Sequence, residues 1–253
     1  MGVLKLLYGG FMSLIREQGP RIHMITNGVT RESCVNLVLS AGGYAICAEA
    51  PEEVEEVVEI ADGLLLNLGM PSAEKAKAME LALQRAKERG IPVVLDPVGV
   101  GVSQFRRDLA SRLLEIGGIT CIRGNAGEIG YLCNGVGASL GVETGSIHVT
   151  EEALQELSTR TGATVMMSGP RDYLVWKSKI VDKPGGGEVF THMTGSGCME
   201  SALLAASIAA TGDAWEGLTE GVRLFDTAGR EAAAKMQGMG SFAVAFLDAM
   251  SHL

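Results

Sequence analysis

The segment of this sequence best suited to chemistry is Thr-Gly-Ser-Gly-Cys at residues 194–198. Gly195 and Gly197 remove side chains from a turn that opens directly into a predicted helix, so the backbone N–H groups of the turn can converge on an anion. The helix dipole adds about 0.3 to 1 kcal/mol at an exposed end. Cys198 falls in the first helical turn, where the pKa of a thiol is commonly lowered. The plainer interpretation is a helix start with a small buried cysteine.

Charged side chains follow two apolar runs elsewhere in the sequence. Asp96 follows one run and precedes a proline, where a carboxylate can hold a metal-bound water or cap a turn. Arg123 follows another run and offers a fork for phosphate, and Glu128 can reach Mg²⁺ directly or through water. Arg123 and Glu128 can equally form an ion-paired loop. Together with the glycine turn, these charged groups favour a phosphate-binding site.

Other candidate residues are less specific. His23 precedes Asn27 after a short apolar stretch, and a lone histidine in such a place is more often structural than catalytic. The methionines are typical core filler. No Gly-x-x-x-x-Gly-Lys-Ser/Thr phosphate loop exists in the sequence, and the Gly-x-Gly at 99–101 lacks the third glycine of a dinucleotide fingerprint. A nucleotide must therefore be held by another scheme.

The elements that would position these residues alternate between helical patterns and short apolar runs. Runs of this kind, apolar on both faces and separated by helices, are typical of βαβ units and a parallel sheet. Ligands of such sheets bind outside the carboxyl ends of the strands. We expect strands at 64–68, 91–95, 119–122 and 163–167, and helices at 51–60, 72–89, 105–116, 126–133 and 151–160.

The two ends of the chain follow different patterns. Leu4, Leu7, Phe11, Leu14 and Ile15 have helical spacing and predict an amphipathic first helix, not a signal peptide. The Gly-rich stretch between Asn134 and Val149 predicts a surface loop. Two further runs predict an antiparallel pair around a glycine turn, and the C-terminal part is helical. These segments are 173–176 with 188–191, the turn at 185–187, and helices at 201–210, 215–235 and 242–250.

Composition sets the class of protein. The 253 residues carry 21 basic and 30 acidic side chains, a net charge of −9 that argues against nucleic-acid binding. A chain that is 47% hydrophobic can form one core without disulfides, and we expect a single domain over 1–253. Five cysteines without a Cys-x-x-Cys pair suit a reducing compartment, so we expect a cytoplasmic protein. No apolar run is long enough to span a membrane.

Four motifs in this order resemble those of the hydroxyethylthiazole kinase family, whose fold is ribokinase-like. They are His-Met-Ile-Thr-Asn at 23–27, Asp-Pro-Val-Gly-Val-Gly at 96–101, Arg-Gly-Asn-Ala-Gly-Glu at 123–128, and Thr-Gly-Ser-Gly-Cys-Met at 194–199. The resemblance covers nearly the whole chain. It implies a three-layer α/β/α fold with a mostly parallel sheet. It also implies MgATP-dependent phosphorylation of the hydroxyl of 5-(2-hydroxyethyl)-4-methylthiazole in thiamine salvage, by a homotrimer with the thiazole site at the subunit boundary.

The resemblance also implies a role for each matching residue. Cys198 is the implied catalytic residue, which would orient the substrate hydroxyl or also deprotonate it. The nucleotide would contact Arg123, Asn125 and Ser168, Mg²⁺ or its waters would contact Asp96 and Glu128, and the substrate alcohol would contact Asn27, Cys47 and Gly195.

Three positions depart from the family pattern. Cys47 stands where the family usually has a methionine lining the thiazole pocket, Ser168 stands where threonine is usual, and residues 188–193 lack the usual Asn-Gly-His stretch. Three alternatives stay open. The first is a kinase of the same fold for a pyrimidine or another small alcohol. The second is a non-catalytic nucleotide-binding trimer, and the third is a thiol hydrolase using Cys198 with His192.

Overall fold

Eight strands form one sheet in the computed structural model, which describes residues 13–134 and 149–253. Their order across the sheet is β2-β1-β3-β4-β5-β6-β7-β8, and all neighbours are parallel as far as β6. The last two strands are antiparallel to their neighbours. The bounds are β1 Arg21–Ile25, β2 Tyr44–Ile46, β3 Gly63–Asn67, β4 Val93–Asp96, β5 Cys121–Asn125, β6 Thr164–Ser168, β7 Arg171–Trp176 and β8 Lys179–Pro184.

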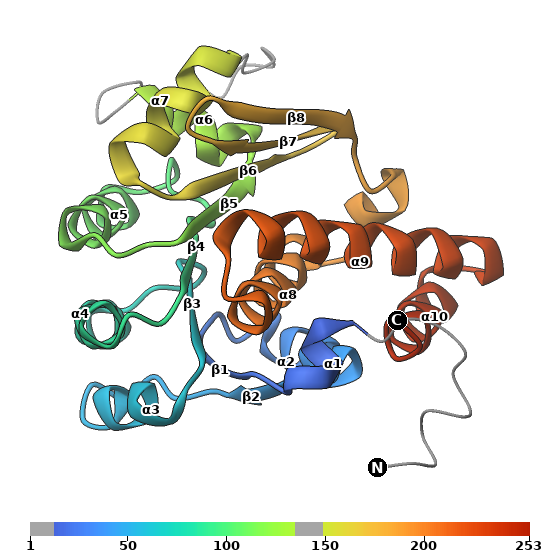
Figure 1. The fold of residues 1–253 in the computed structure, drawn as a ribbon, viewed down its shortest axis with the longest axis horizontal. Helices are drawn as coiled ribbons and strands as arrows, with labels where there is room; N and C mark the ends of the chain where they lie inside the picture. Colours follow the sequence, from blue (N-terminus) through green and yellow to red (C-terminus); the bar gives the residue numbers. More distant parts are fainter. Residues whose placement is uncertain (1–12, 135–148) are drawn as a thin grey trace.

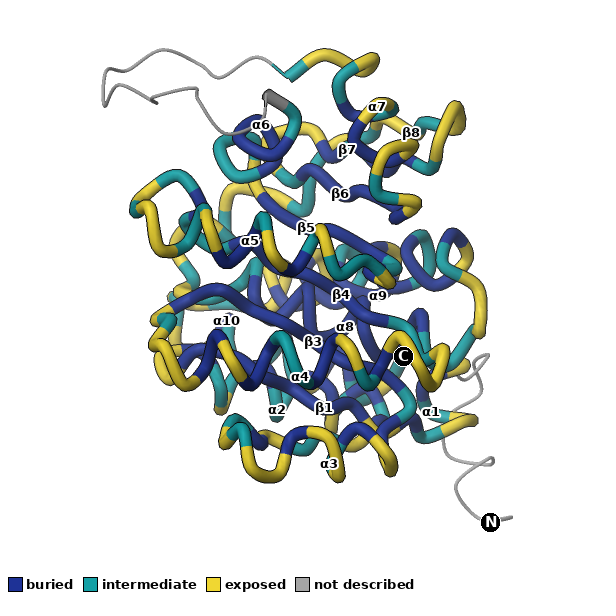
Figure 2. Tube along the Cα trace, turned by 90° about the vertical axis from the view of Figure 1, so that its left-hand side faces the viewer, coloured by how far each residue is buried: buried dark blue, intermediate teal, exposed yellow. Residues whose placement is uncertain are grey.

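Helices cover both faces of the sheet, which confirms the predicted three-layer α/β/α fold (Figure 1). One layer holds α3 Val54–Ile60, α4 Ala73–Arg89, α5 Gln104–Ile116, α6 Ala126–Asn134 and α7 Glu151–Thr161. The other holds α1 Leu14–Gln18, α2 Arg31–Ala41, α8 Ser196–Thr211, α9 Ala214–Lys235 and α10 Met239–Met250. Figure 2 shows the consequence, a buried sheet behind helices that each expose one side.

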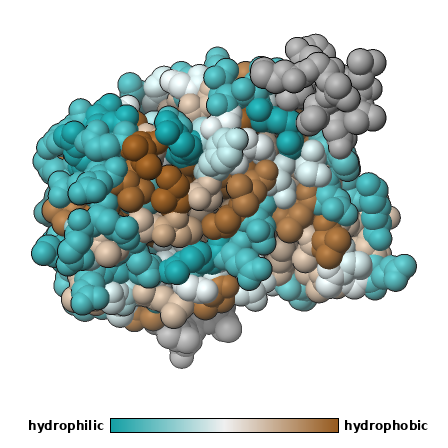
Figure 3. Space-filling view, turned by 90° about the horizontal axis from the view of Figure 1, so that it is seen from below, coloured by the Kyte–Doolittle hydropathy of each residue, from teal (hydrophilic) through white to brown (hydrophobic). Residues whose placement is uncertain are grey.

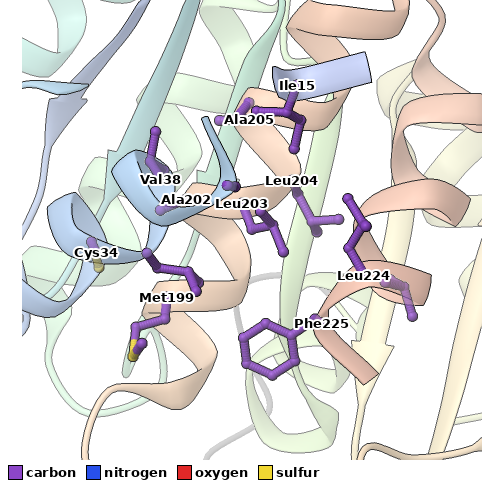
Figure 4. Close-up of a cluster of buried hydrophobic side chains, with 14 of the residues drawn as sticks. Ile15, Cys34, Val38, Met199, Ala202, Leu203, Leu204, Ala205, Leu224 and Phe225 are labelled. Carbon is purple, nitrogen blue, oxygen red and sulfur yellow. The ribbon is translucent and has the colours of Figure 1, made fainter. Parts of the chain in front are cut away.

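The core is divided by the sheet into two apolar clusters, one under each helical layer. Helix α8 is apolar nearly all round, because it packs against the sheet on one side and against α2 and α9 on the others. Figure 4 shows its side chains between those of α1, α2 and α9. A Cβ on Gly217 of α9 would overlap the backbone of Ile208, so this glycine allows α9 to approach α8 closely. Helix α8 is thereby held rigidly against the sheet.

The predicted parallel strands are confirmed with shifts of a few residues, but the predicted strand at 188–191 is wrong. β7 pairs instead with β8, across a tight turn in which Lys177 has a φ of 55°. Residues Glu188–His192 form a 3₁₀ helix. The physical reason lies in Phe190, whose ring packs on Phe225 and Phe246 and so holds the segment against α9 and α10.

Some parts of the chain were not predicted, and others lie outside the described residues. The sequence does not predict β1, α2 or β2, because polar residues interrupt their short apolar runs. Of the predicted first helix, Leu4, Leu7 and Phe11 lie outside the described residues, and only Leu14–Gln18 is seen as helix. The predicted loop between Asn134 and Val149 also lies outside them. The single domain over 1–253 stays a prediction.

Strand register brings the polar strand ends together. Asn67 at the end of β3 lies opposite Asp96 at the end of β4, and Asn125 at the end of β5 lies opposite Ser168 at the end of β6. Helix α8 begins above the same edge of the sheet, where the sequence places the glycine turn. Within residues 13–134 and 149–253, none of the helices has the length and apolarity needed to cross a membrane.

Candidate active site

A cavity of about 700 Å³ lies at the carboxyl ends of β5 and β6. Arg123, Asn125 and Ser168 line it, three residues for which a role in nucleotide binding was implied. Gly197 at the start of α8 and Phe190 of the 3₁₀ helix also line it. Loops far apart in sequence therefore enclose one space outside the carboxyl ends of the strands, where ligands of parallel sheets bind.

Arg123 is fixed by two partners. Its Nε and Nη2 both donate to Oε2 of Glu200, at 3.1 and 2.7 Å, and Nη2 also donates to the hydroxyl of Ser168 at 2.8 Å. Both charged side chains are nearly buried. Burial alone would lower the pKa of Arg123, but Glu200 and then Asp96 more than compensate, so the pKa is raised and the guanidinium stays charged.

The start of α8 lies directly against this guanidinium. A Cβ built on Gly197 would overlap Nη1 of Arg123, so a larger residue here would displace the guanidinium from its position. Gly195 has a φ of 79°, and a Cβ on it would overlap Thr30. The two glycines thus place first-turn N–H groups, which have no acceptor within the helix, beside a cation. An anion is the ligand that this arrangement suits.

Asp96 is fully buried at the end of β4. Its Oδ2 accepts hydrogen bonds from Nδ2 of Asn67 at 2.7 Å and from the hydroxyl of Ser201 at 2.9 Å. Its Oδ1 is buried without a hydrogen-bond partner among the described residues. Burial raises the pKa of Asp96 to about 7, against the opposite effect of Arg123. A buried carboxylate with one unpaired oxygen is suited to a cation or a cation-bound water.

Glu128 caps the start of α6 together with Asn125. The Asn125 side chain accepts from the N–H of Glu128, and the Glu128 Oε2 accepts from the N–H of Asn125, both at 2.9 Å. Its Oε1 accepts from the N–H of Gly99 at 2.9 Å. Glu128 therefore orders the loop after β4 as well as its own helix. Each oxygen keeps a second lone pair, which can accept from a water on Mg²⁺.

The fit to Mg²⁺ rests on these two carboxylates. Among the described residues, no group of three or more His, Cys, Asp or Glu side chains could enclose a metal ion. Mg²⁺ is commonly held by one or two carboxylates, waters and substrate phosphates, so Asp96 and Glu128 beside a phosphate cavity are an adequate set.

Cys198 is buried in the first turn of α8. Burial, and then the charge of Asp96, raise the pKa of its thiol, so the lowered pKa expected from the helix start is wrong. The side-chain amide of Asn27 donates to its sulfur at 3.5 Å. Burial outweighs the helix dipole here because the site excludes water around the sulfur. The thiol is protonated near neutral pH.

Two of the remaining candidate residues, Cys47 and His23, lie toward the β2 edge of the sheet. Cys47 is exposed just after β2, the strand that ends the sheet at that edge. His23 is buried, and its Nε2 lies 2.9 Å from the carbonyl oxygen of Ala48, in line with a structural role. His192 is exposed on the 3₁₀ helix while Cys198 is buried, so the geometry does not favour a thiol hydrolase.

Sequence reasoning missed three residues of the site: Asn67, Glu200 and Ser201. Each is a polar residue inside an apolar element, and all three are buried. A buried polar side chain needs a partner, so a polar residue in a run of apolar ones is the signal that could have found them. Its partner cannot be named from the sequence.

Comparisons with known proteins identify the family of this chain. The model of the hydroxyethylthiazole kinase family matches residues 12–253. A hydroxyethylthiazole kinase of Methanoculleus marisnigri is 39% identical over 245 residues, 96% of this chain and 88% of that protein. The structure of a hydroxyethylthiazole kinase protein from Pyrococcus horikoshii has a TM-score of 0.85 and 29% identity, covering 94% of this chain and 90% of that one.

A ribokinase-like superfamily protein from Enterococcus faecalis shares the fold alone. Its TM-score is 0.68 at 14% identity, with 93% of this chain and 88% of that chain covered. The predicted ribokinase-like architecture is thereby confirmed.

The raised pKa of Asp96 predicts a pH-dependent stability. Asp96 keeps its proton up to about pH 7 in the folded state but only up to about pH 3.8 in the unfolded state. The stabilisation that comes from this difference is therefore fully present below about pH 4 and is lost as the pH rises through 7. Asp96→Asn cannot ionise and escapes this loss. We expect its free energy of unfolding, relative to the unmodified protein, to rise by about 3 kcal/mol from pH 5 to pH 8.

Urea unfolding at both pH values measures this difference. Asp248→Asn, which removes an exposed carboxylate of α10, controls for the general loss of a negative charge. The raised pKa of Asp96 is contradicted if the free energies of unfolding of Asp96→Asn and Asp248→Asn change with pH by the same amount.

Proposed function

The chain belongs to the hydroxyethylthiazole kinase family and is a phosphotransferase, and we propose that it phosphorylates the hydroxyl of 5-(2-hydroxyethyl)-4-methylthiazole with MgATP, a step of thiamine salvage. The observation that carries the proposal is the cavity in which a charged Arg123, locked by Glu200, faces the glycine start of α8. A polyphosphate is the ligand with enough charge to use both features.

The residues around this cavity would bind the phosphates of ATP. Arg123 Nη1 and the first-turn N–H groups of α8 would contact the phosphate oxygens, with Ser168 and Asn125 beside them. These donors are already fixed before ATP arrives, because Glu200 and Ser168 hold the guanidinium and the close packing of Gly197 holds the helix. Preorganised donors stabilise the charge that shifts during transfer without having to reorient.

Asp96 and Glu128 would hold Mg²⁺ or its waters, through the unpaired Oδ1 of Asp96 and the free lone pairs of Glu128. Mg²⁺ neutralises charge on the β- and γ-phosphates in reactions of this class. The Asn67 and Ser201 hydrogen bonds keep Oδ2 of Asp96 occupied, so its Oδ1 is left for this role.

Cys198 would position the attacking hydroxyl. Its raised pKa keeps the thiol protonated, which makes it a poor base at rest. Phosphoryl transfer through a loose transition state depends on positioning and charge stabilisation more than on early proton removal. Asn27, bonded to the sulfur, and Gly195, before the same helix, would contact the alcohol from adjacent sides.

The substrate pocket would be completed at a subunit boundary of a homotrimer. Cys47 is exposed just after the edge strand β2, and β2, α2 and α1 also leave apolar side chains exposed, namely Tyr44, Leu39 and Leu14. Figure 3, which views the molecule from below, shows apolar patches among polar ones on that side. An exposed edge strand with apolar neighbours is suited to burial against a second copy. The free thiols support a cytoplasmic location.

Substrate identity is tested by assaying MgATP with a panel of alcohols. We expect kcat/KM for 5-(2-hydroxyethyl)-4-methylthiazole to exceed that for a hydroxymethylpyrimidine by at least about tenfold, because a site shaped to one ring leaves polar groups unpaired with another. ADP release and the phosphorylated product are measured together. A higher value for the pyrimidine would replace the proposal with the kinase for another alcohol, and no ADP with any alcohol would favour the non-catalytic trimer.

Two glycine variants, one at the proposed site and one matched control, are measured in the same assay. Gly197→Ala would push Arg123 out of place and is expected to lower kcat/KM at least about tenfold. Gly240→Ala, in α10 where a Cβ meets open space, should stay within about twofold of the unmodified protein.

Replacing Cys198 separates positioning from base catalysis. We expect Cys198→Ala to lower kcat by about tenfold to a hundredfold with little change in KM for ATP, since the phosphate donors stay in place. Steady-state kinetics with both substrates measure this. A loss beyond about 10⁴-fold would indicate a base instead, and an unchanged kcat would remove Cys198 from the mechanism.

Light scattering during gel filtration tests the assembly. We expect a mass three times that of the 26.5 kDa chain, and dissociation of that species by Tyr44→Glu, which places a charge on β2. Val181→Glu introduces the same change on β8, at the opposite end of the sheet, and is expected to leave the trimer intact. A monomeric unmodified protein would contradict the proposal.

A further inference from the structure

Two buried side-chain amides join Asp96 to Cys198 in a continuous line of hydrogen bonds. Asn67 Nδ2 donates to Asp96 Oδ2 at 2.7 Å, and Asn67 Oδ1 accepts from Asn27 Nδ2 at 3.1 Å. The same Nδ2 of Asn27 donates to the sulfur of Cys198 at 3.5 Å. The line runs from the end of β4 across β3 and the segment after β1 to α8, so it crosses the site from the metal side to the thiol side.

Each amide can adopt only one orientation. Asn67 Oδ1 also accepts from the N–H of Gly69 at 2.9 Å, so a flipped amide would set two donors against each other there and two oxygens against each other at Asp96. Asn27 Oδ1 accepts from the N–H groups of Val29 and Thr30, at 3.1 and 3.0 Å, which excludes its flipped form. The donor edge of Asn27 must therefore face Asn67 and the sulfur.

Close packing leaves these amides no space to rotate. Asn67 is fully buried and Asn27 is 5% exposed. A Cβ on Gly69 would lie 2.9 Å from both the Asn27 Cβ and the Asn67 Oδ1, so the backbone there is pressed against the pair. The lengths of the two amides thus fix how far the carboxylate stands from the thiol.

We propose that Asn67 is a positioning residue that sets Cys198 in place relative to Asp96. Asn67 also lies within hydrogen-bonding reach of the Cys198 thiol itself. It occupies Oδ2 of Asp96, and it holds the Asn27 amide so that its second N–H meets the sulfur. The thiol is thereby held among the side chains of Asn27, Asn67 and Thr30 at the start of α8, where it would meet the substrate hydroxyl. This role in the reaction rests on the proposed kinase function.

Ser201 provides a matched comparison. Its hydroxyl donates to the same Oδ2 of Asp96 at 2.9 Å, but its other bond is to the carbonyl of Gly197, and no bond links it to the sulfur. Removing either donor leaves Asp96 less well paired. Only the removal of Asn67 also releases the Asn27 amide from its acceptor.

A double-mutant cycle tests whether Asn67 acts through Cys198. Asn67→Leu, which keeps the size of the side chain and removes its polar atoms, is expected to lower kcat at least about tenfold in the unmodified protein but less than about threefold in Cys198→Ala. KM for ATP should change less than about twofold. Ser201→Ala should change kcat by the same factor, within about twofold, in both backgrounds.

A second readout does not need kinase activity. The rate at which methyl methanethiosulfonate modifies Cys198 at pH 8, followed by peptide mass spectrometry, should fall at least about fivefold in Asn67→Leu and stay within about twofold in Ser201→Ala, because a donor to the sulfur favours the reactive thiolate. This arm still decides the inference if no alcohol is phosphorylated. If thermal melting shows that Asn67→Leu does not fold, Asn67→Ser replaces it, since serine is too short to bridge Asp96 and Asn27. Equal kcat factors for the Asn67 variant in both backgrounds, or an unchanged modification rate, would overturn the inference.

Discussion

The buried ion pair between Arg123 and Glu200 is the interaction on which the site depends. It joins the end of β5 to the first turns of α8, two elements 77 residues apart in the sequence, at a nitrogen–oxygen distance of 2.7 Å. Removing one partner of such a pair leaves an uncompensated buried charge and typically costs about 3 to 5 kcal/mol. The pair keeps Arg123 charged inside the protein and sets its free edge against Gly197, so the groups proposed to bind phosphate are in place before any ligand binds.

Exclusion of water affects the groups around that pair in two ways. It strengthens the attraction between a fixed cation and an incoming phosphate, and it raises the pKa of both Asp96 and Cys198. The cost of burying Asp96 is met only in part by its two hydrogen bonds, which leaves one oxygen unpaired. A bound cation would supply the missing partner. The site is therefore built to be completed by its ligands, which is how a phosphotransferase reserves its electrostatic stabilisation for the transferred group.

The sequence predicts what depends on local pattern. The strands before Asp96, Arg123 and Ser168 are apolar on both faces, so their ends, and the edge where these side chains meet, follow from period and turn chemistry. The sequence does not predict the roles of Asn67 and Glu200, because these depend on partners 29 and 77 residues away.

The sequence predicts a strand at 188–191 because a short mixed run fits the period of a strand as well as that of a helix. Only the packing of Phe190 against α9 and α10 decides between the two structures. The predicted lowering of the Cys198 pKa is wrong because burial, which the sequence does not report, has a larger effect on this pKa than the helix dipole.

In the proposed reaction, the sheet separates recognition of the alcohol from that of the nucleotide. The phosphate cavity lies over β5 and β6, whereas Cys47 follows β2 at the opposite edge, and the start of α8 stands between the two. A change at Cys47 can therefore alter the shape of the alcohol pocket without moving Arg123, Glu200 or the glycine turn. The same separation requires a rigid connection between the two halves, since phosphoryl transfer needs its two oxygens in line. Helix α8, packed on the sheet and carrying both Gly197 and Cys198, is that connection, and the amides of Asn67 and Asn27 connect the same two halves along the strand ends.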